Sequence, residues 1–105
     1  MQTPNLKYIN ELAEEDEAFK QNVIEVLKIE FPKEVAVFYK KYHANDVKGI
    51  VNIVHKMKYK FSLLGLENDF NLATEFEKEV GNDNKELFTK FENVLLKIDR
   101  YLKTI

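Results

Sequence analysis

The chain has 105 residues, 45% hydrophobic and 32% charged, so we expect one folded domain over residues 1–105 rather than a disordered segment. Its formal net charge of −2 argues against nucleic-acid binding, and the absence of cysteine excludes disulfides, thiolate metal sites and cysteine nucleophiles. The first residues do not resemble a signal peptide and no segment is long enough to span a bilayer, so we expect a cytoplasmic protein without membrane attachment.

The first predicted helix is short. Thr3 followed by Pro4 has the pattern of an N-cap and a first helical residue, because proline needs no hydrogen-bond acceptor at that position. The apolar residues of this helix are Leu6, Ile9 and Leu12. We expect it to pack over one end of the domain.

The second predicted element is long and follows the acidic run of residues 14–17, which favours a helix start. Its apolar residues recur at helical spacing on both sides of a proline: Phe19, Val23, Val26, Leu27, then Val35, Phe38, Tyr39 and Tyr42. Pro32 cannot donate a backbone hydrogen bond. We therefore expect one long helix with a bend, or two nearly continuous helices.

The third predicted helix is capped by Asn45 or Asp46 and ends near Gly65, a position that suits a left-handed C-terminal residue. Its apolar stripe consists of Val47, Ile50, Val51, Val54, Met57, Phe61 and Leu64. A further short helix carries Phe70, Ala73, Phe76 and Val80 and is predicted to end at Gly81.

The last helix is predicted to open with a capping box formed by Asp83 and Glu86. Its apolar seam consists of Leu87, Phe91, Val94, Ile98, Tyr101 and Ile105. Several amphipathic helices with short polar connections, and no alternating strand pattern, predict an all-α fold: an up-and-down antiparallel four-helix bundle with a short leading N-terminal helix.

His55 is the candidate functional residue of the third helix. At 100° per residue it lies about 100° from Val54, the centre of the apolar stripe, and hence at the solvent edge. The residues on the same polar side are Lys48, Asn52, Tyr59 and Ser62. An exposed neutral imidazole is a competent nucleophile toward phosphorus, and Lys58, one turn on, could offset phosphate charge through a charge-assisted hydrogen bond.

From the residues alone, a histidine on a polar helix face is usually a solvated side chain. However, the segment VHKMKYKFSLLG, residues 54–65, resembles the signature of histidine-containing phosphotransfer (HPt) domains, which runs His-x-x-Lys-Gly with a second glycine ten residues after the histidine. His55, Lys58 and Gly65 match those anchors. The similarity extends from about residue 6 to residue 102.

The resemblance implies a monomeric carrier of a two-component phosphorelay, which accepts a phosphoryl group on His55 from one receiver-domain aspartate and passes it to another. Lys58 would stabilise the phosphate, and the residues that contact the receiver would be Val51, Asn52, Tyr59 and Ser62. The partners would be response-regulator receiver domains, including those of hybrid histidine kinases. No cofactor or metal is expected on this chain, since magnesium would be bound by the receiver.

Tyr59 departs from the family pattern, which usually has glycine there, and Val54 replaces a common small residue. A tyrosine at this position could shield His55, donate a hydrogen bond to the phosphoryl group or alter partner choice. Two alternatives therefore stay open: a non-catalytic module of the same fold that docks a receiver or helical partner, and a helical adaptor unrelated to signalling.

Other enzyme classes are poorly supported. A histidine kinase dimerisation segment would have an acidic residue where Lys56 stands and a proline soon afterwards, and the chain has no phosphate loop for ATP, so no ATP-dependent kinase activity is expected. A di-iron bundle would need glutamate three residues before each histidine, where Lys40 and Asn52 stand instead. His43 lies in a predicted turn and is interpreted as structural or incidental.

Overall fold

Helices form nearly all of the structure, a computed structural model that describes residues 2–105. The elements are α1 (Lys7–Ala13), α2 (Glu17–His43), α3 (Val47–Leu63), α4 (Glu67–Glu79), the 3-10 helix η1 (Val80–Asn82) and α5 (Lys85–Leu102). No strand occurs in this part of the chain, so the predicted all-α class is confirmed. Between residues 2 and 105, no helix combines the length and the apolar character needed to cross a membrane.

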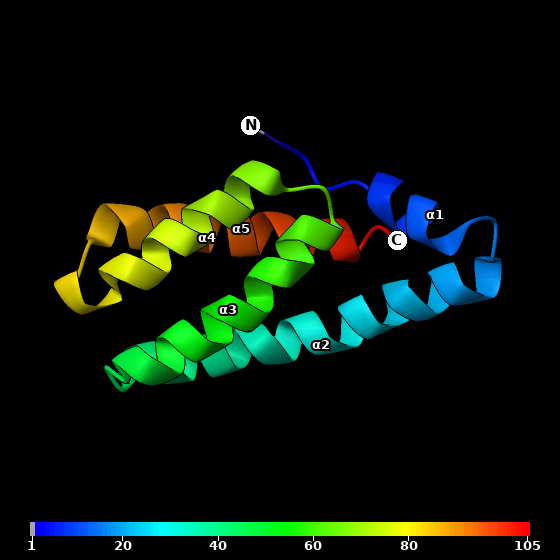
Figure 1. Ribbon diagram of the computed structural model, residues 1–105. Coiled ribbons are helices and arrows are strands. Elements are labelled where there is room, and N and C mark those ends of the chain that lie inside the picture. Colours follow the sequence, from blue (N-terminus) through cyan, green and yellow to red (C-terminus); the bar gives the residue numbers. More distant parts are fainter. Residues whose placement is uncertain (1) are drawn as a thin grey trace.

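Successive long helices run in opposite directions (Figure 1). α2 and α4 run one way along the long axis, and α3 and α5 run the other. α3 lies between α2 and α4 and packs against both, and α5 packs against α4 and α2. The short α1 packs against α2, as expected for a leading helix at one end of the domain.

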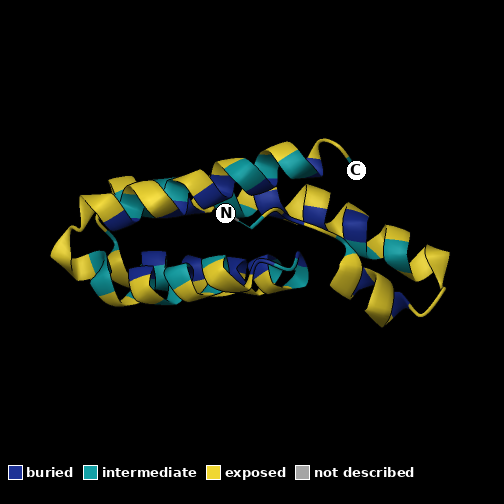
Figure 2. Cartoon of the chain, turned by 90° about the horizontal axis from the view of Figure 1, so that it is seen from above, coloured by how far each residue is buried: buried dark blue, intermediate teal, exposed yellow. Residues whose placement is uncertain are grey.

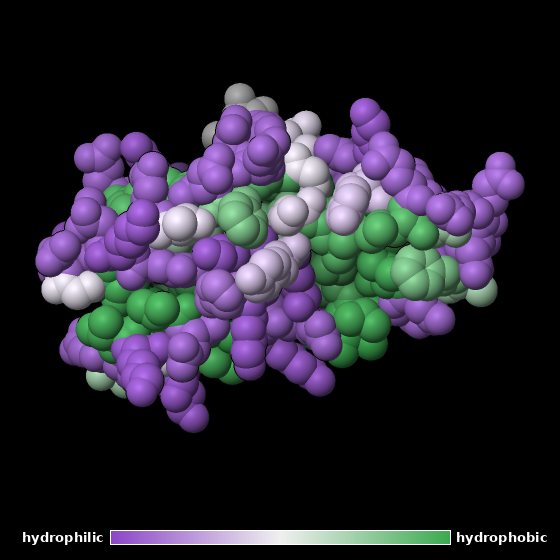
Figure 3. Space-filling view, in the orientation of Figure 1, coloured by the Kyte–Doolittle hydropathy of each residue, from purple (hydrophilic) through white to green (hydrophobic). Residues whose placement is uncertain are grey.

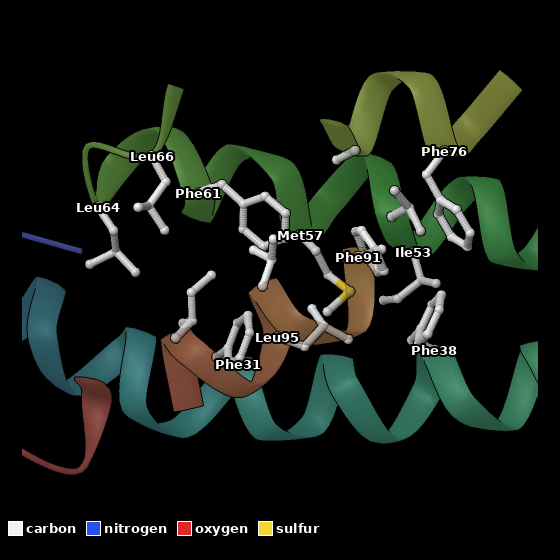
Figure 4. Close-up of a cluster of buried hydrophobic side chains, with 14 of the residues drawn as sticks. Phe31, Phe38, Ile53, Met57, Phe61, Leu64, Leu66, Phe76, Phe91 and Leu95 are labelled. Carbon is white, nitrogen blue, oxygen red and sulfur yellow. The ribbon is translucent and has the colours of Figure 1, made fainter. Parts of the chain in front are cut away.

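The core lies between the facing sides of these helices, with exposed residues on their outer sides (Figure 2). In Figure 4, Met57 and Phe61 of α3 point toward Phe31 and Phe38 of α2. Phe91 of α5 completes the contact, because its ring centroid is 5.1 Å from that of Phe38 and 5.9 Å from that of Phe61. All five side chains are fully buried. Aromatic rings from three helices therefore hold α3 in place beside α2.

The N-terminus of α3 is formed as predicted. Asp46 is its N-cap, with its carboxylate accepting a 2.9 Å hydrogen bond from the backbone N–H of Gly49. This bond and the nearby Lys41 ammonium lower the pKa of Asp46, against a smaller opposing effect of desolvation. The opposite end is also as predicted, since Gly65 has φ +76° and the N–H groups of Gly65 and Leu66 bond back to Ser62 and Phe61.

Two predicted helix starts are wrong. α1 begins at Lys7 rather than at Pro4, because the backbone N–H of Asn5 bonds to the Leu64 carbonyl and the Asn5 side chain accepts from Lys7. α5 is capped by Asn84, whose side chain accepts from the N–H of Leu87, so the predicted capping box does not form. Asp83 instead has φ +52° and links η1 to α5.

The helix predicted to end at Gly81 stops being α-helical at Glu79, and η1 continues the turn. α2, in contrast, is one continuous helix through the exposed Pro32, so the prediction of a single long element rather than two helices is confirmed. Its second half packs as expected around Phe38. In its first half, Leu27 is buried and Val23 packs against the core as the periodicity predicts, whereas Phe19 and Val26 of the same predicted face are exposed.

Candidate functional site

His55 lies in the middle of α3 with 53% of its side chain exposed, as the helical wheel predicts. Its neighbours in sequence, Val54 and Met57, are fully buried and fix the helix against the core. The backbone that carries His55 is therefore held firmly while the imidazole remains accessible. This combination of a rigid helix and an accessible side chain suits a group that reacts with a second protein.

The Nδ1 edge of His55 faces Glu77, which α4 supplies from across the helix interface. Glu77 Oε1 is 3.6 Å from His55 Nδ1 and 3.1 Å from Lys58 Nζ. The carboxylate is thus shared by the exposed imidazole and a buried ammonium. Its negative charge beside Nδ1 favours the tautomer with a proton on that nitrogen, which leaves the lone pair on Nε2.

Lys58 is largely buried between α3 and α4. Only 9% of its side chain and 15% of that of Glu77 are exposed. Its ammonium also lies 3.4 Å from the Thr74 hydroxyl and 5.2 Å from the centroid of the Phe70 ring. A single element, α4, therefore supplies every group that holds this lysine.

Tyr59 covers the other edge of the imidazole. Its hydroxyl is 3.2 Å from His55 Nε2, and the two rings meet edge to face with centroids 5.2 Å apart. With the proton on Nδ1, the hydroxyl donates to Nε2. The nitrogen that would act as nucleophile is consequently engaged by a side chain of the same helix, one turn away.

The remaining predicted contact residues do not share one cavity. Val51 is partly buried, while Asn52 and Ser62 are exposed and line separate shallow depressions on either side of His55. Gly65 ends the helix and has no polar role. Residues 51 to 62 nevertheless lie along the same helix, so one partner laid along α3 could reach them all.

An apolar groove lies beside Tyr59, between the first half of α2 and the end of α3. It has a volume of about 570 Å³, and its lining residues are Phe19, Asn22, Val23, Val26, Leu27, Glu30, Tyr59, Lys60 and Leu63. Figure 3 shows a green hydrophobic area over this part of the molecule. Periodicity groups Phe19 and Val26 on one helix face with Val23 and Leu27, and it does not show whether another helix covers them, so the groove was not predicted from the sequence.

A second charged cluster fixes α3 to α2 beside this groove. Lys60 Nζ lies 2.9 Å from Glu34 and 3.1 Å from Glu30. Burial by itself lowers the pKa of Lys60, but the hydrogen bonds to Glu34 and Glu30 outweigh it and the pKa is raised. Lys60 therefore stays charged and forms part of the structure rather than of the reactive site.

Glu77 is the residue that sequence reasoning did not assign to the site. Spacing along α4 does not reveal which residues lie across the interface with α3, so the sequence does not predict this contact. Within residues 2–105, no group of three or more His, Asp or Glu side chains could hold a metal ion. The chain matches no protein-family model, and searches of curated proteins and of solved structures found no match.

Proposed function

We propose that the chain is a histidine phosphotransfer protein, which takes a phosphoryl group on His55 from one receiver-domain aspartate and delivers it to another. The observation that carries the proposal is the exposed imidazole whose Nδ1 faces the Glu77 carboxylate. A fixed carboxylate at one ring nitrogen makes the other a better nucleophile, as in other sites where histidine is oriented by an acid. The sequence resemblance around His55, Lys58 and Gly65 points to the same chemistry.

In the proposed step the Nε2 lone pair attacks the phosphorus of an aspartyl phosphate. The N–P bond forms as the P–O bond to the acyl group breaks, and the aspartate carboxylate leaves with the electron pair. The Nδ1 proton stays on the ring, where Glu77 offsets the positive charge of the phosphoimidazolium. Lys58 contributes positive charge beside the site and holds Glu77 in position. Magnesium belongs to the receiver, so the chain itself supplies no cofactor.

The arrangement of the helices supports this proposal. Alternating directions of α2, α3, α4 and α5, with α1 at one end, suit an up-and-down antiparallel four-helix bundle, the architecture that the resemblance implies. We propose that the protein is a cytoplasmic monomer that docks its receivers along α3. Tyr59 and the groove beside it provide the apolar part of this contact. The docking surface extends along α3 to the polar Asn52 and Ser62 and the half-buried Val51.

A second candidate function is a docking module of the same fold that binds a receiver without exchanging phosphate. The observation in its favour is the Tyr59 hydroxyl, which engages the nitrogen that would be phosphorylated. The two functions make different demands on His55. A carrier needs the imidazole itself, whereas a docking module should bind its partner nearly as well without it.

The test is incubation with a panel of phosphorylated receiver domains and magnesium, followed by measurement of acid-labile, base-stable phosphate. Wild type is compared with His55→Gln and with His43→Gln, which removes the other histidine of the chain. Label on wild type and His43→Gln but not on His55→Gln is expected. Receiver binding without label on any variant would replace the carrier with the docking module, and label lost only in His43→Gln would reject the assigned site.

A further inference from the structure

Tyr59 occupies an unusual position relative to the reactive nitrogen. In the neutral tautomer favoured by Glu77, Nε2 carries the one in-plane lone pair of the imidazole ring. The Tyr59 hydroxyl oxygen lies 3.2 Å from this nitrogen. While this lone pair accepts a hydrogen bond from Tyr59, it cannot attack phosphorus. Tyr59 must therefore move away from Nε2 before a phosphoryl group can be added.

The same ring forms part of the apolar groove between α2 and α3. It is exposed, and its aromatic contacts are edge-on approaches to His55 and, at 6.3 Å between centroids, to Phe70. A partner that fills the groove therefore touches the side chain that covers the nucleophile. Tyr59 thus contributes both to the groove surface and to the covering of His55 Nε2.

We propose that Tyr59 is a gate: its hydroxyl caps His55 Nε2 in the free protein, and docking of a receiver against the groove displaces it and releases the nucleophile. This inference rests on the proposed phosphotransfer function. It assigns Tyr59 a specificity role, because a small phosphodonor that does not occupy the groove meets a capped imidazole, whereas a docked receiver meets an open one.

Phosphoramidate is the probe that separates these cases, since it transfers a phosphoryl group without a docking protein. The donor reacts as its N-protonated zwitterion: Nε2 attacks phosphorus, the P–N bond breaks, ammonia leaves with the electron pair of that bond, and the Nδ1 proton remains beside Glu77. Loss of one neutral hydrogen bond worth about 1 kcal/mol corresponds to about a fivefold change in rate. We expect Tyr59→Phe to accelerate labelling by phosphoramidate about fivefold.

The receiver donor should respond differently. When the docked receiver has already opened the gate, Tyr59→Phe and wild type should be labelled at nearly equal rates, so the ratio of the two rates falls toward one. Tyr59→Ala removes the ring as well, and we expect fast labelling by phosphoramidate together with a higher KM for the receiver. Tyr101→Phe, a change at a tyrosine of α5 that lines a different depression together with Leu96 and Lys97, is the control and should leave both rates unchanged.

A measurement without any phosphodonor tests the contact itself. The ¹⁵N resonance of His55 Nε2 should move toward that of a free imidazole nitrogen in Tyr59→Phe and stay in place in Tyr101→Phe. An unmoved resonance, or a phosphoramidate rate that is equal to or lower than that of wild type, would overturn the gate. An acceleration of the same size with both donors would overturn its link to docking.

These outcomes distinguish the gate from the function on which it rests. Equal labelling of wild type and Tyr59→Phe, with none on His55→Gln, removes the gate and leaves the phosphotransfer function intact. No label on wild type from either donor, with all proteins folded by circular dichroism, removes both.

Discussion

The ion pair between Lys58 and Glu77 makes a quantitative prediction about stability. At 3.1 Å and an effective dielectric constant of about 20, the Coulomb attraction amounts to about 5 kcal/mol, from which the desolvation of both groups must be subtracted. Because both side chains are largely buried, loss of either partner leaves the other charge poorly solvated. We expect Glu77→Leu and Lys58→Met each to lower the free energy of unfolding by about 3 kcal/mol.

The double variant, which combines Lys58→Met with Glu77→Leu, should be far less damaging than the sum of the single ones. With both charges gone, the two introduced side chains present apolar surfaces to each other, and we expect a loss of about 1 to 2 kcal/mol. Urea unfolding of the four proteins, monitored by circular dichroism, gives the coupling energy from a double-mutant cycle. These values correspond to a coupling of about 4 to 5 kcal/mol.

An exposed pair in the same protein provides the control. Lys90 and Glu86 of α5 are 3.4 Å apart, but 59% and 82% of their side chains are exposed, so the same cycle there should give a coupling of about 0.5 kcal/mol or less. Comparable coupling energies in the two cycles, or additive effects of Lys58→Met and Glu77→Leu, would refute the argument that burial makes this pair strong.

Two further predictions concern backbone strain and pH. Gly65→Ala should lower the free energy of unfolding by about 1 to 2 kcal/mol, because φ is +76° and a Cβ would lie 2.6 Å from the Asn5 side chain. Gly81→Ala is the control and should change it by less than about 0.5 kcal/mol, because no atom lies within 4 Å of the added Cβ. Equal urea midpoints for the two variants would contradict this prediction. The pKa of Tyr39 is raised to about 12 by burial, by the hydrogen bond to Glu92 and by the negative charge of that residue. The Tyr39 hydroxyl therefore keeps its proton in the folded state at pH values above about 10, where the unfolded state loses it. Stability should therefore fall between pH 10 and 12, and the fall should be smaller in Tyr39→Phe; parallel curves of unfolding free energy against pH would reject the assignment.

The features that depend on neighbouring residues along the chain could be predicted from the amino-acid sequence. The Asp46 cap, the left-handed Gly65 and the buried positions Val54, Met57 and Phe61 follow from hydrogen bonds and side-chain periodicity within one or two turns of α3. The same periodicity places His55 at the solvent edge, where the structure has it. These interactions are local, so spacing predicts them.

The pairing of the helices, and the apolar residues that other helices cover, depend on the folding of the whole chain and were not predictable from periodicity. α1 starts late because Asn5 bonds to Leu64, which is distant in the sequence, and Phe19 and Val26 remain exposed because no helix packs over that side of α2. The pairing of Glu77 with His55 and Lys58 arises in the same way, across the interface of α3 and α4. Periodicity indicates which face of a helix is apolar. The element that packs against this face depends on the path of the whole chain, because the packing energy comes from contacts between residues that are distant in the sequence.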